Sequence, residues 1–146
     1  MKSSKVNKEL REKISDPKKV GPGIWYLIHS RSLKTVTMAQ KQAYAQFVQE
    51  TVTDIRCEDC KGHALKYIQN NPMHPYFNVK DVKTGAEIGC FKWSFLFHND
   101  VNRRLGKHEL DFDTAFMLYA NAEACKECTK NSQGSKGYKI IEKKSH

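Results

Sequence analysis

The chain has 146 residues, a hydrophobic fraction of 39% and a net charge of +9 at pH 7, which suits one domain with a modest core. No apolar run approaches the roughly 18–20 residues that span a bilayer, and no apolar segment follows the basic N-terminus, so we expect neither a membrane span nor a secretory signal. We therefore expect a cytoplasmic protein, whose five cysteines favour redox chemistry or metal binding over structural disulfides.

The positive charge is concentrated at the two ends of the chain. The basic residues of these ends are Lys2, Lys5, Lys8, Arg11, Lys13, Lys18, Lys19, Lys126, Lys130, Lys136, Lys139, Lys143 and Lys144. Such ends are typical of solvated arms, and we expect a basic N-terminal arm at 1–20 and a flexible basic tail at 126–146. Nucleic acid is another interpretation of the charge, but no zinc-finger or RNP signature accompanies it, so we do not expect nucleic acid as a partner.

Apolar residues at helical spacing predict an all-α domain between these arms. Gly21-Pro22-Gly23 marks the expected start of the first helix, whose apolar face carries Ile24, Leu27 and Ile28. Helices are expected at about 24–33, 38–55, 57–70, 87–105 and 111–124, with a loop at 71–86. The core candidates of the fourth helix are Phe91, Phe95, Leu96 and Val101. The fold class is therefore a four-helix bundle with a short fifth helix.

The pair Cys57-x-x-Cys60 opens the third predicted helix. Unpaired backbone N–H groups in the first turn of a helix, together with the helix dipole, favour the thiolate form of a cysteine. Three interpretations are open: a redox-active pair, half of a zinc site, or two buried cysteines without chemistry. A thioredoxin-like site is not expected, because that site follows a strand and the segment before Cys57 is helical in pattern.

A second pair, Cys125-x-x-Cys128, follows the fifth predicted helix. Two such pairs could supply four thiolates to zinc, which gives the alternative hypothesis of a zinc-binding helical adaptor. However, 64 residues separate Cys60 from Cys125, against the roughly 15–20 of a short zinc module. At the start of a flexible tail, Cys125 and Cys128 would suit a shuttle that carries electrons to the first pair. Cys90 has no evident partner and is interpreted as a buried free thiol or as half of an intersubunit disulfide.

Polar side chains gather on one side of the fourth predicted helix. His98, Asn99 and Asn102 share that side, and Lys107 follows the end of the helix. The pattern fits either an amphipathic helix whose polar face meets water or a site for a planar cofactor that carries phosphate. Likewise, His29 and His98 could be hydrogen-bonded core histidines or contacts of that cofactor.

Three motifs together resemble the Erv/ALR family of FAD-linked sulfhydryl oxidases over about residues 21–125. They are Gly21-x-x-x-Trp25-x-x-x-His29, then Cys57-x-x-Cys60-x-x-His63, then Trp93 with His98-Asn99-x-Val101-Asn102-x-Arg104-Leu105-Gly106-Lys107. Their order, helical placement and spacing all agree with the family. The chain is most similar to the short forms encoded by large cytoplasmic DNA viruses, which would place it in the host cytoplasm, the virion or both.

The resemblance implies FAD at the mouth of the bundle, a homodimer, and oxidation of two thiols to a disulfide while O2 becomes hydrogen peroxide. Cys60 would lie against the flavin and pass electrons to it, and Cys57 would exchange with dithiols of protein substrates. No metal is implied. The residues that would line the FAD site are Gly21, Trp25, His29, His98, Asn99, Val101, Asn102 and Lys107.

The chain departs from many cellular members of the family at the fifth helix. Those members join this region to the preceding helix by a structural disulfide, whereas here the matching stretch carries Phe95 and Phe112 without a cysteine. We therefore expect the fifth helix to be held by the packing of Phe112, Phe116 and Tyr119. In family members an aromatic residue of this region meets the adenine, and both Phe116 and Tyr119 are candidates.

Overall fold

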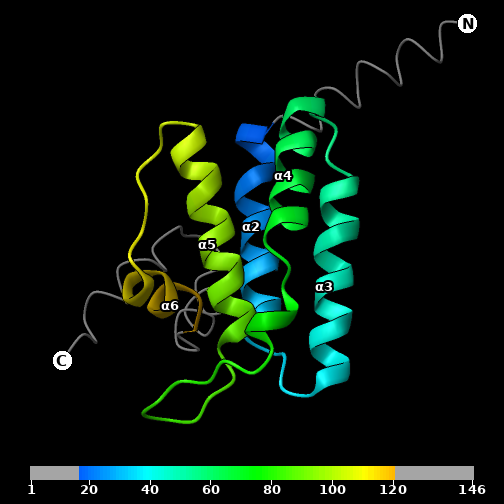
Figure 1. Ribbon diagram of the computed structural model, residues 1–146. Coiled ribbons are helices and arrows are strands. Elements are labelled where there is room, and N and C mark those ends of the chain that lie inside the picture. Colours follow the sequence, from blue (N-terminus) through cyan, green and yellow to red (C-terminus); the bar gives the residue numbers. More distant parts are fainter. Residues whose placement is uncertain (1–16, 121–146) are drawn as a thin grey trace, which may run out of the picture.

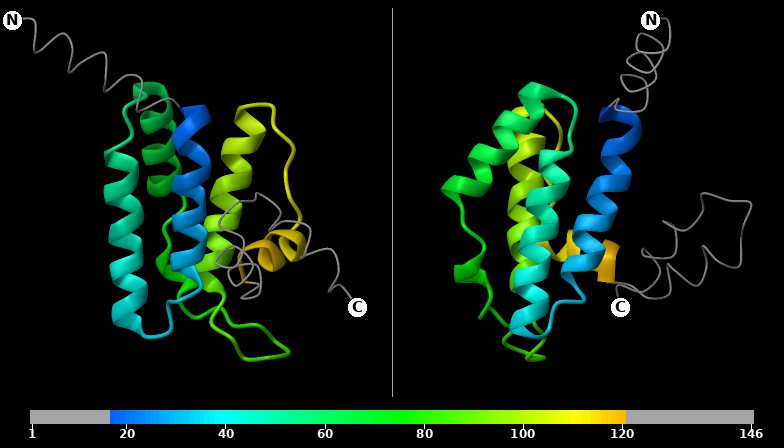
Figure 2. Two further views of the ribbon diagram at one scale, coloured as in Figure 1. Left: turned by 180° about the vertical axis from the view of Figure 1, so that it is seen from behind. Right: turned by 90° about the vertical axis from the view of Figure 1, so that its right-hand side faces the viewer.

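The computed structural model describes residues 17–120, with side chains from Gly21 onward, as a helical bundle (Figure 1). Its helices are α2 (Pro17–Ser32), α3 (Met38–Thr53), α4 (Glu58–Asn70), the 3-10 turn η1 (His74–Tyr76), α5 (Gly89–Arg104) and α6 (Phe112–Ala120). Four long helices lie side by side, and the short α6 packs against α2 and α5 (Figure 2). Within the described part of the chain, β pairing is limited to one isolated bridge between Lys80 and Glu87. The predicted all-α bundle with a short fifth helix is confirmed.

The first helix begins earlier than predicted. It starts at Pro17 rather than near Ile24, so the predicted arm at 1–20 and this helix overlap, and Pro22 lies inside the helix. Proline is tolerated at the first helical position because its missing N–H would have no partner there. Pro22 costs the helix one backbone hydrogen bond, which the packing of α2 on α3 and α5 offsets. The predicted apolar face is also partly wrong, because Leu27 is 58% exposed whereas Ile28 is buried.

The remaining long helices begin and end close to their predicted bounds because their ends are capped locally. The side chain of Thr37 accepts the N–H of Gln40, and the Gln40 side chain accepts the N–H of Thr37, which forms a capping box at α3. Gly106 adopts a positive φ of 70°, and the backbone N–H of Lys107 donates to the carbonyl of Asn102 at 2.7 Å. Glycine reaches that conformation without strain, so it ends α5 as predicted.

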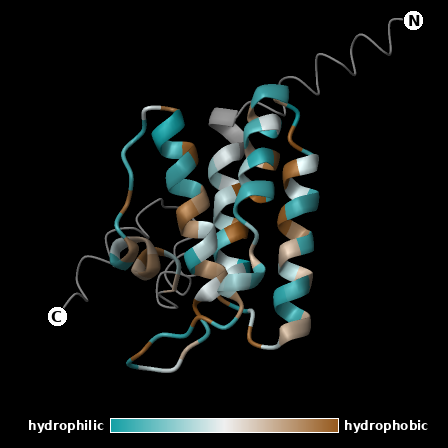
Figure 3. Cartoon of the chain, in the orientation of Figure 1, coloured by the Kyte–Doolittle hydropathy of each residue, from teal (hydrophilic) through white to brown (hydrophobic). Residues whose placement is uncertain are grey.

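The core is formed by one face of each long helix. Its buried hydrophobic side chains include Ile28, Tyr44, Val48, Val52, Ala64, Met73, Phe77, Cys90, Trp93 and Phe97. Trp93 and Phe97, one turn apart on α5, were not among the predicted core residues, whereas the predicted Leu96 is 36% exposed. Figure 3 shows that the lower part of α5, beside α6, is more hydrophobic than its upper end. Every helix within 17–120 is too short or too polar to span a bilayer.

Aromatic packing holds α6 in place, as predicted. The ring of Phe91 meets the rings of Phe112 and Phe116 edge to face, with centroids 5.7 and 5.5 Å apart. Phe95 meets Phe112 in the same way at 5.4 Å. Asp111 caps the helix by accepting the backbone N–H and the hydroxyl of Thr114. Edge-to-face pairs of this kind stabilise beyond the apolar area that they bury.

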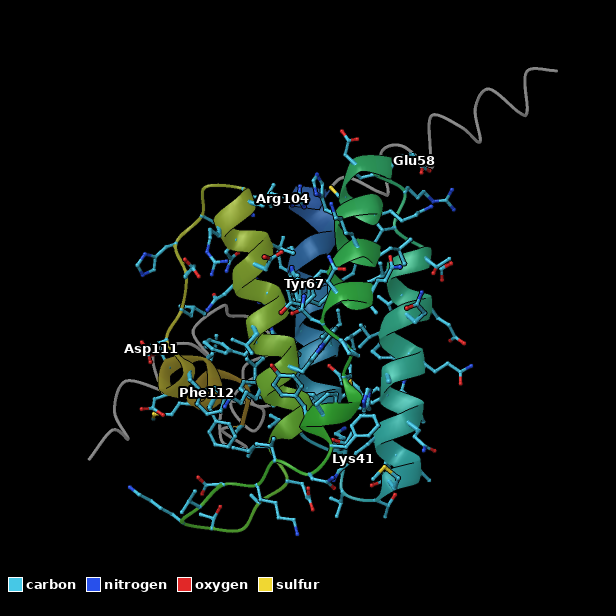
Figure 4. The ribbon with its side chains drawn as sticks, viewed as in Figure 1. Lys41, Glu58, Tyr67, Arg104, Asp111 and Phe112 are labelled. Carbon is cyan, nitrogen blue, oxygen red and sulfur yellow. The ribbon has the colours of Figure 1, made fainter. Side chains whose placement is uncertain are left out.

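A buried lysine ties the loop before α5 to the start of α3. The Lys41 ammonium donates to the backbone carbonyl of Phe77 at 2.5 Å and to the Glu87 carboxylate at 2.7 Å. Figure 4 places Lys41 at the end of the bundle opposite Glu58 and Arg104. The charge of Lys41 is therefore paired, and it lies at the other end of the bundle from the start of α4, where Cys57 and Cys60 are found. We assign Lys41 a structural role.

Gly89, the first residue of α5, provides a test of this packing. A Cβ atom there would lie 1.6 Å from the backbone carbonyl oxygen of Tyr76, which no side-chain rotation can relieve. We predict that Gly89→Ala lowers the free energy of unfolding by about 3 kcal/mol or more in urea titrations, as overpacking of a tight contact does. Gly62→Ala is the matched control, because Gly62 lies inside α4 with no atom within 4 Å of the added methyl group. It should stabilise the protein by about 0.5–1 kcal/mol, and equal stability of the two variants would contradict the close approach.

Candidate active site

Cys57 and Cys60 form a hydrogen-bonded pair at the N-terminus of α4. Cys57 is the N-cap, and its sulfur accepts the backbone N–H of Cys60 at 3.3 Å. The two sulfur atoms are 2.6 Å apart, and both side chains are partly exposed. The pair therefore combines reach to solvent with the electrostatic field of a helix start.

The two thiols of this pair have opposite electrostatic environments. Hydrogen bonds from the thiol and the backbone N–H of Cys60 lower the pKa of Cys57. Burial, followed by the hydrogen bond to Cys57, raises the pKa of Cys60, while the Arg104 guanidinium acts on Cys60 in the opposite direction. Cys57 is thus the thiol that ionises first, and a cation lies beside the second sulfur.

Arg104 reaches the cysteine pair because the C-terminal end of α5 and the N-terminal end of α4 lie at the same end of the bundle. Figure 4 shows Arg104 and Glu58 at the same end of the bundle. Arg104 is the last residue of α5, and Glu58 is the first of α4. The sequence indicated Arg104 only as part of a motif, since its proximity to Cys60 depends on the packing of two distant helices.

Three predicted cofactor residues form one stack between α2 and α5. The rings of Trp25 and His98 are parallel within 4°, with centroids 4.0 Å apart. Nε2 of His29 lies 2.8 Å from Nδ1 of His98, and the His29 ring also lies 4.4 Å from the ring of Tyr119 on α6. Burial is the main cause that lowers the pKa of His29 to about 3 and that of His98 to about 4, with Lys107 contributing to the second. Both rings are therefore neutral near pH 7.

The remaining predicted residues lie at the end of α5 and in the loop after it. Asn99 is buried and clamps this loop: its amide donates to the carbonyl of Leu110 at 2.7 Å and accepts the N–H of Leu110 at 3.1 Å. Asn102 donates to the Asn99 side chain, and its carbonyl holds the backbone of Lys107. Arg103 braces the same loop through an ion pair of 2.6 Å with Glu109. The loop that carries Lys107 is therefore held at several points.

Two of the predicted residues have less specific surroundings. Val101 is partly buried and packs against the hydrophobic core. Gly21 is half-buried near the start of α2, and no atom lies within 4 Å of the place where a Cβ would stand. Both lie on the helices that carry the stack, but no contact in the structure brings either one into it.

Of the other three cysteines, the structure describes Cys90. The side chain of Cys90 is 2% exposed and lies in the hydrophobic core, and burial raises the pKa of its thiol. Among the described residues Cys90 is a free and buried thiol, which favours the first interpretation over an intersubunit disulfide. Cys125 and Cys128, and with them the complete zinc set, lie outside the described residues.

Sequence comparison assigns the family. The profile of the Erv1/Alr family matches residues 22–120, a span that holds all the contacts described above. The chain belongs to the Erv1/Alr family. Two viral members are similar in sequence. The FAD-linked sulfhydryl oxidase of African swine fever virus, isolate Tick/Malawi/Lil 20-1/1983, is 29% identical over 102 residues, which cover 68% of this chain and 78% of that protein. A protein of Invertebrate iridescent virus 3 is 28% identical over 107 residues, which cover 71% and 68%.

The fold of the Erv1/Alr family is present as well. The core of yeast Erv1 superimposes with a TM-score of 0.60 over 73% of this chain and 86% of that structure, at 23% sequence identity. At that identity the match supports the arrangement of helices alone. It agrees with the bundle predicted from the helical spacing of the apolar residues.

The unequal thiols predict an order of chemical modification. Because the thiolate reacts with iodoacetamide and the Cys57 pKa is lowered, Cys57 should be alkylated at lower pH than Cys60, with buried Cys90 last. The measurement is the initial rate at which each of the three cysteines is labelled, read residue by residue in mass spectrometry of the reduced full-length chain across pH 6–9. In urea the three rates should converge. Faster labelling of Cys60 in the folded protein would contradict the assignment.

Proposed function

We propose that this protein is an FAD-dependent thiol oxidase in which Cys57 and Cys60 form the redox-active pair. It converts two thiols and O2 into a disulfide and hydrogen peroxide. The observation that carries this proposal is the pair itself: two thiols with opposed pKa shifts at a helix start, beside Arg104, in a member of the Erv1/Alr family. The name of the viral relative supports the same activity. The family match favours it over a zinc-binding adaptor.

The chemistry of the stack between α2 and α5 fits FAD. Trp25 and His98 present parallel aromatic rings, which suit a planar group. Neutral histidines can form hydrogen bonds without burying a charge, and the Lys107 ammonium is close enough to His98 to lower its pKa and suits a phosphate. We assign FAD binding to Gly21, Trp25, His29, His98, Val101, Asn102 and Lys107. Asn99, whose amide is bonded to the loop, would act by holding that loop.

The cysteine pair would perform disulfide exchange on the substrate. A substrate thiolate attacks the Cys57 sulfur of the oxidised pair, which breaks the Cys57–Cys60 bond and releases Cys60 as a thiolate. Burial affects Cys60 more than Cys57, so Cys57 is the sulfur that a substrate reaches. The Arg104 guanidinium stabilises the released thiolate. A second substrate thiolate then attacks the mixed disulfide, which frees the substrate disulfide and the Cys57 thiolate.

The cofactor supplies the remaining redox chemistry. When bound, FAD would supply the two-electron acceptor for the reduced pair, with O2 as the final acceptor and hydrogen peroxide as its product. The role of the chain in this step is to place the Arg104 guanidinium beside Cys60, which opposes the effect of burial on its pKa, and to orient the Cys60 sulfur. Cys60 lies in the first turn of α4, so its backbone is fixed while Cys57 exchanges.

An absorption spectrum of the purified protein tests this proposal. A flavin band should bleach when a dithiol is added and recover as O2 is consumed, with one peroxide formed per disulfide. Cys57→Ser and Cys60→Ser should each lower the turnover of a small dithiol by more than about 100-fold, since neither can close the disulfide. Cys90→Ala is the matched control, because Cys90 is buried away from the exposed pair, and it should keep its turnover. Protein that stays colourless with added FAD, or turnover retained in either serine variant, would overturn the assignment.

We further propose that Cys125 and Cys128 carry electrons from protein dithiols to the first pair. Their position after the fifth helix in the sequence supports this role. Cys125→Ser should preserve turnover of a small dithiol, which reaches Cys57 directly, and lower turnover of a reduced protein substrate by about tenfold. Parallel peroxide assays with both substrates measure the difference. Equal activity of variant and wild type on the protein substrate would remove the shuttle role.

Assembly and location form part of the same proposal. We infer a homodimer from the family resemblance. The viral sources of the similar proteins support a place in the host cytoplasm or the virion. A sedimentation measurement of the purified chain tests the dimer.

A further inference from the structure

A buried serine stands at the inner end of the histidine stack. Ser94 is fully buried on α5, one turn before His98, and its hydroxyl lies 2.9 Å from Nδ1 of His29. The other ring nitrogen of His29 lies 2.8 Å from Nδ1 of His98. Ser94 is also 2.8 Å from the backbone carbonyl of Phe91, to which it donates. These contacts form one continuous series of hydrogen bonds from the backbone of α5 to the ring of His98.

Counting the protons shows which atom donates and which accepts in each of these hydrogen bonds. The Ser94 hydroxyl has one proton, and its other two partners are acceptors: the Phe91 carbonyl, and the Tyr44 hydroxyl, whose own proton is donated to Ile28. With its proton engaged by either of them, Ser94 accepts from His29. The proton of the neutral His29 ring is therefore on Nδ1, which leaves Nε2 as an acceptor. Nδ1 of His98 must then donate to His29, and Nε2 of the neutral His98 ring carries a lone pair.

Two further contacts agree with this direction. The parallel stack on Trp25 fixes the plane of the His98 ring, and Nδ1 is held by His29, so the direction of Nε2 is fixed as well. The positive charge of Lys107 lies close enough to act on His98. A cation favours a lone pair over an N–H group on the ring that it faces.

We propose that Ser94 is a positioning residue, which sets the tautomers of His29 and His98 so that Nε2 of His98 accepts a hydrogen bond from an N–H or O–H donor of FAD. This inference rests on the proposed function, because it assigns FAD to the stack. The side chain of Ser94 is fully buried, so the proposal gives it no contact of its own with FAD or substrate. Its effect passes through two imidazole rings, and its removal leaves the Nδ1–H of His29 buried without an acceptor.

The test reads the tautomers directly. Long-range proton–nitrogen NMR of the full-length chain with ¹⁵N-labelled histidine should show protonated Nδ1 and bare Nε2 for both His29 and His98, with and without added FAD. In Ser94→Ala the rings of His29 and His98 should no longer each occupy this one tautomer. The dissociation constant for FAD should rise about tenfold, while kcat at saturating FAD stays within about twofold. Ser94→Thr, which keeps the hydroxyl, should restore both the tautomers and the affinity.

A matched control separates this role from simple loss of a buried hydroxyl. Ser32 is equally buried on α2 and donates its hydroxyl to the backbone carbonyl of His29 without touching either ring nitrogen. Ser32→Ala should leave tautomers and FAD affinity unchanged. If Ser94→Ala does not fold, the wild-type tautomers and the threonine variant still decide the matter.

The outcomes distinguish this inference from the proposed function. Protonated Nε2 on His98 in the wild type, with normal FAD binding, would overturn the role of Ser94 alone. Unchanged tautomers and FAD affinity in Ser94→Ala would do the same. Tautomers as expected in a protein that binds no FAD would overturn the proposed function, and with it the acceptor role of His98.

Discussion

The contact between α2 and α5 is the interaction on which the rest of the structure depends. It packs Trp25 against Phe97, sets His98 parallel to Trp25, and brings His29 within hydrogen-bond distance of both His98 and Ser94. None of these groups is close to its partner in sequence. The same packing creates the low-dielectric surroundings that keep both imidazole rings neutral. A shift of one helix against the other would disturb the core and the candidate cofactor site together, so stability and function share one interface.

The end of α5 connects this interface to the cysteine pair and to α6. Arg104 faces Cys60, while the loop that follows is held by the Asn99 amide and leads into α6. Phe91 and Phe95 then hold Phe112 by ring contacts in place of a covalent link. Because these contacts contain no sulfur, the attachment of α6 does not depend on the redox state of the surroundings. The only cysteines near the proposed chemistry, among the described residues, are the pair that performs it.

Local signals predicted most of the fold, and tertiary contacts account for what the sequence did not reveal. Thr37, Cys57 and Gly106 mark helix ends because each acts on its own neighbours in the chain. The start of α2 was predicted wrongly, since Pro17 and Pro22 are both compatible with a helix start. The motifs indicated the stack, but its ring distances need two helices 65 to 69 residues apart. Ser94 lies one turn before His98, a spacing that sequence reasoning could have used and did not.

The position of Cys57 as the N-cap of α4 links thiol chemistry to the order of that helix. The sulfur atom that we propose to exchange with substrate also accepts the backbone N–H of Cys60. A thiolate is a strong acceptor, whereas a sulfur engaged in a disulfide is a weak one. The first turn of α4 is therefore held most firmly when Cys57 is a free thiolate, and it loosens while the sulfur is bonded to another. In the proposed cycle the N-cap of α4 would therefore weaken each time Cys57 enters a disulfide and strengthen each time it is released as a thiolate.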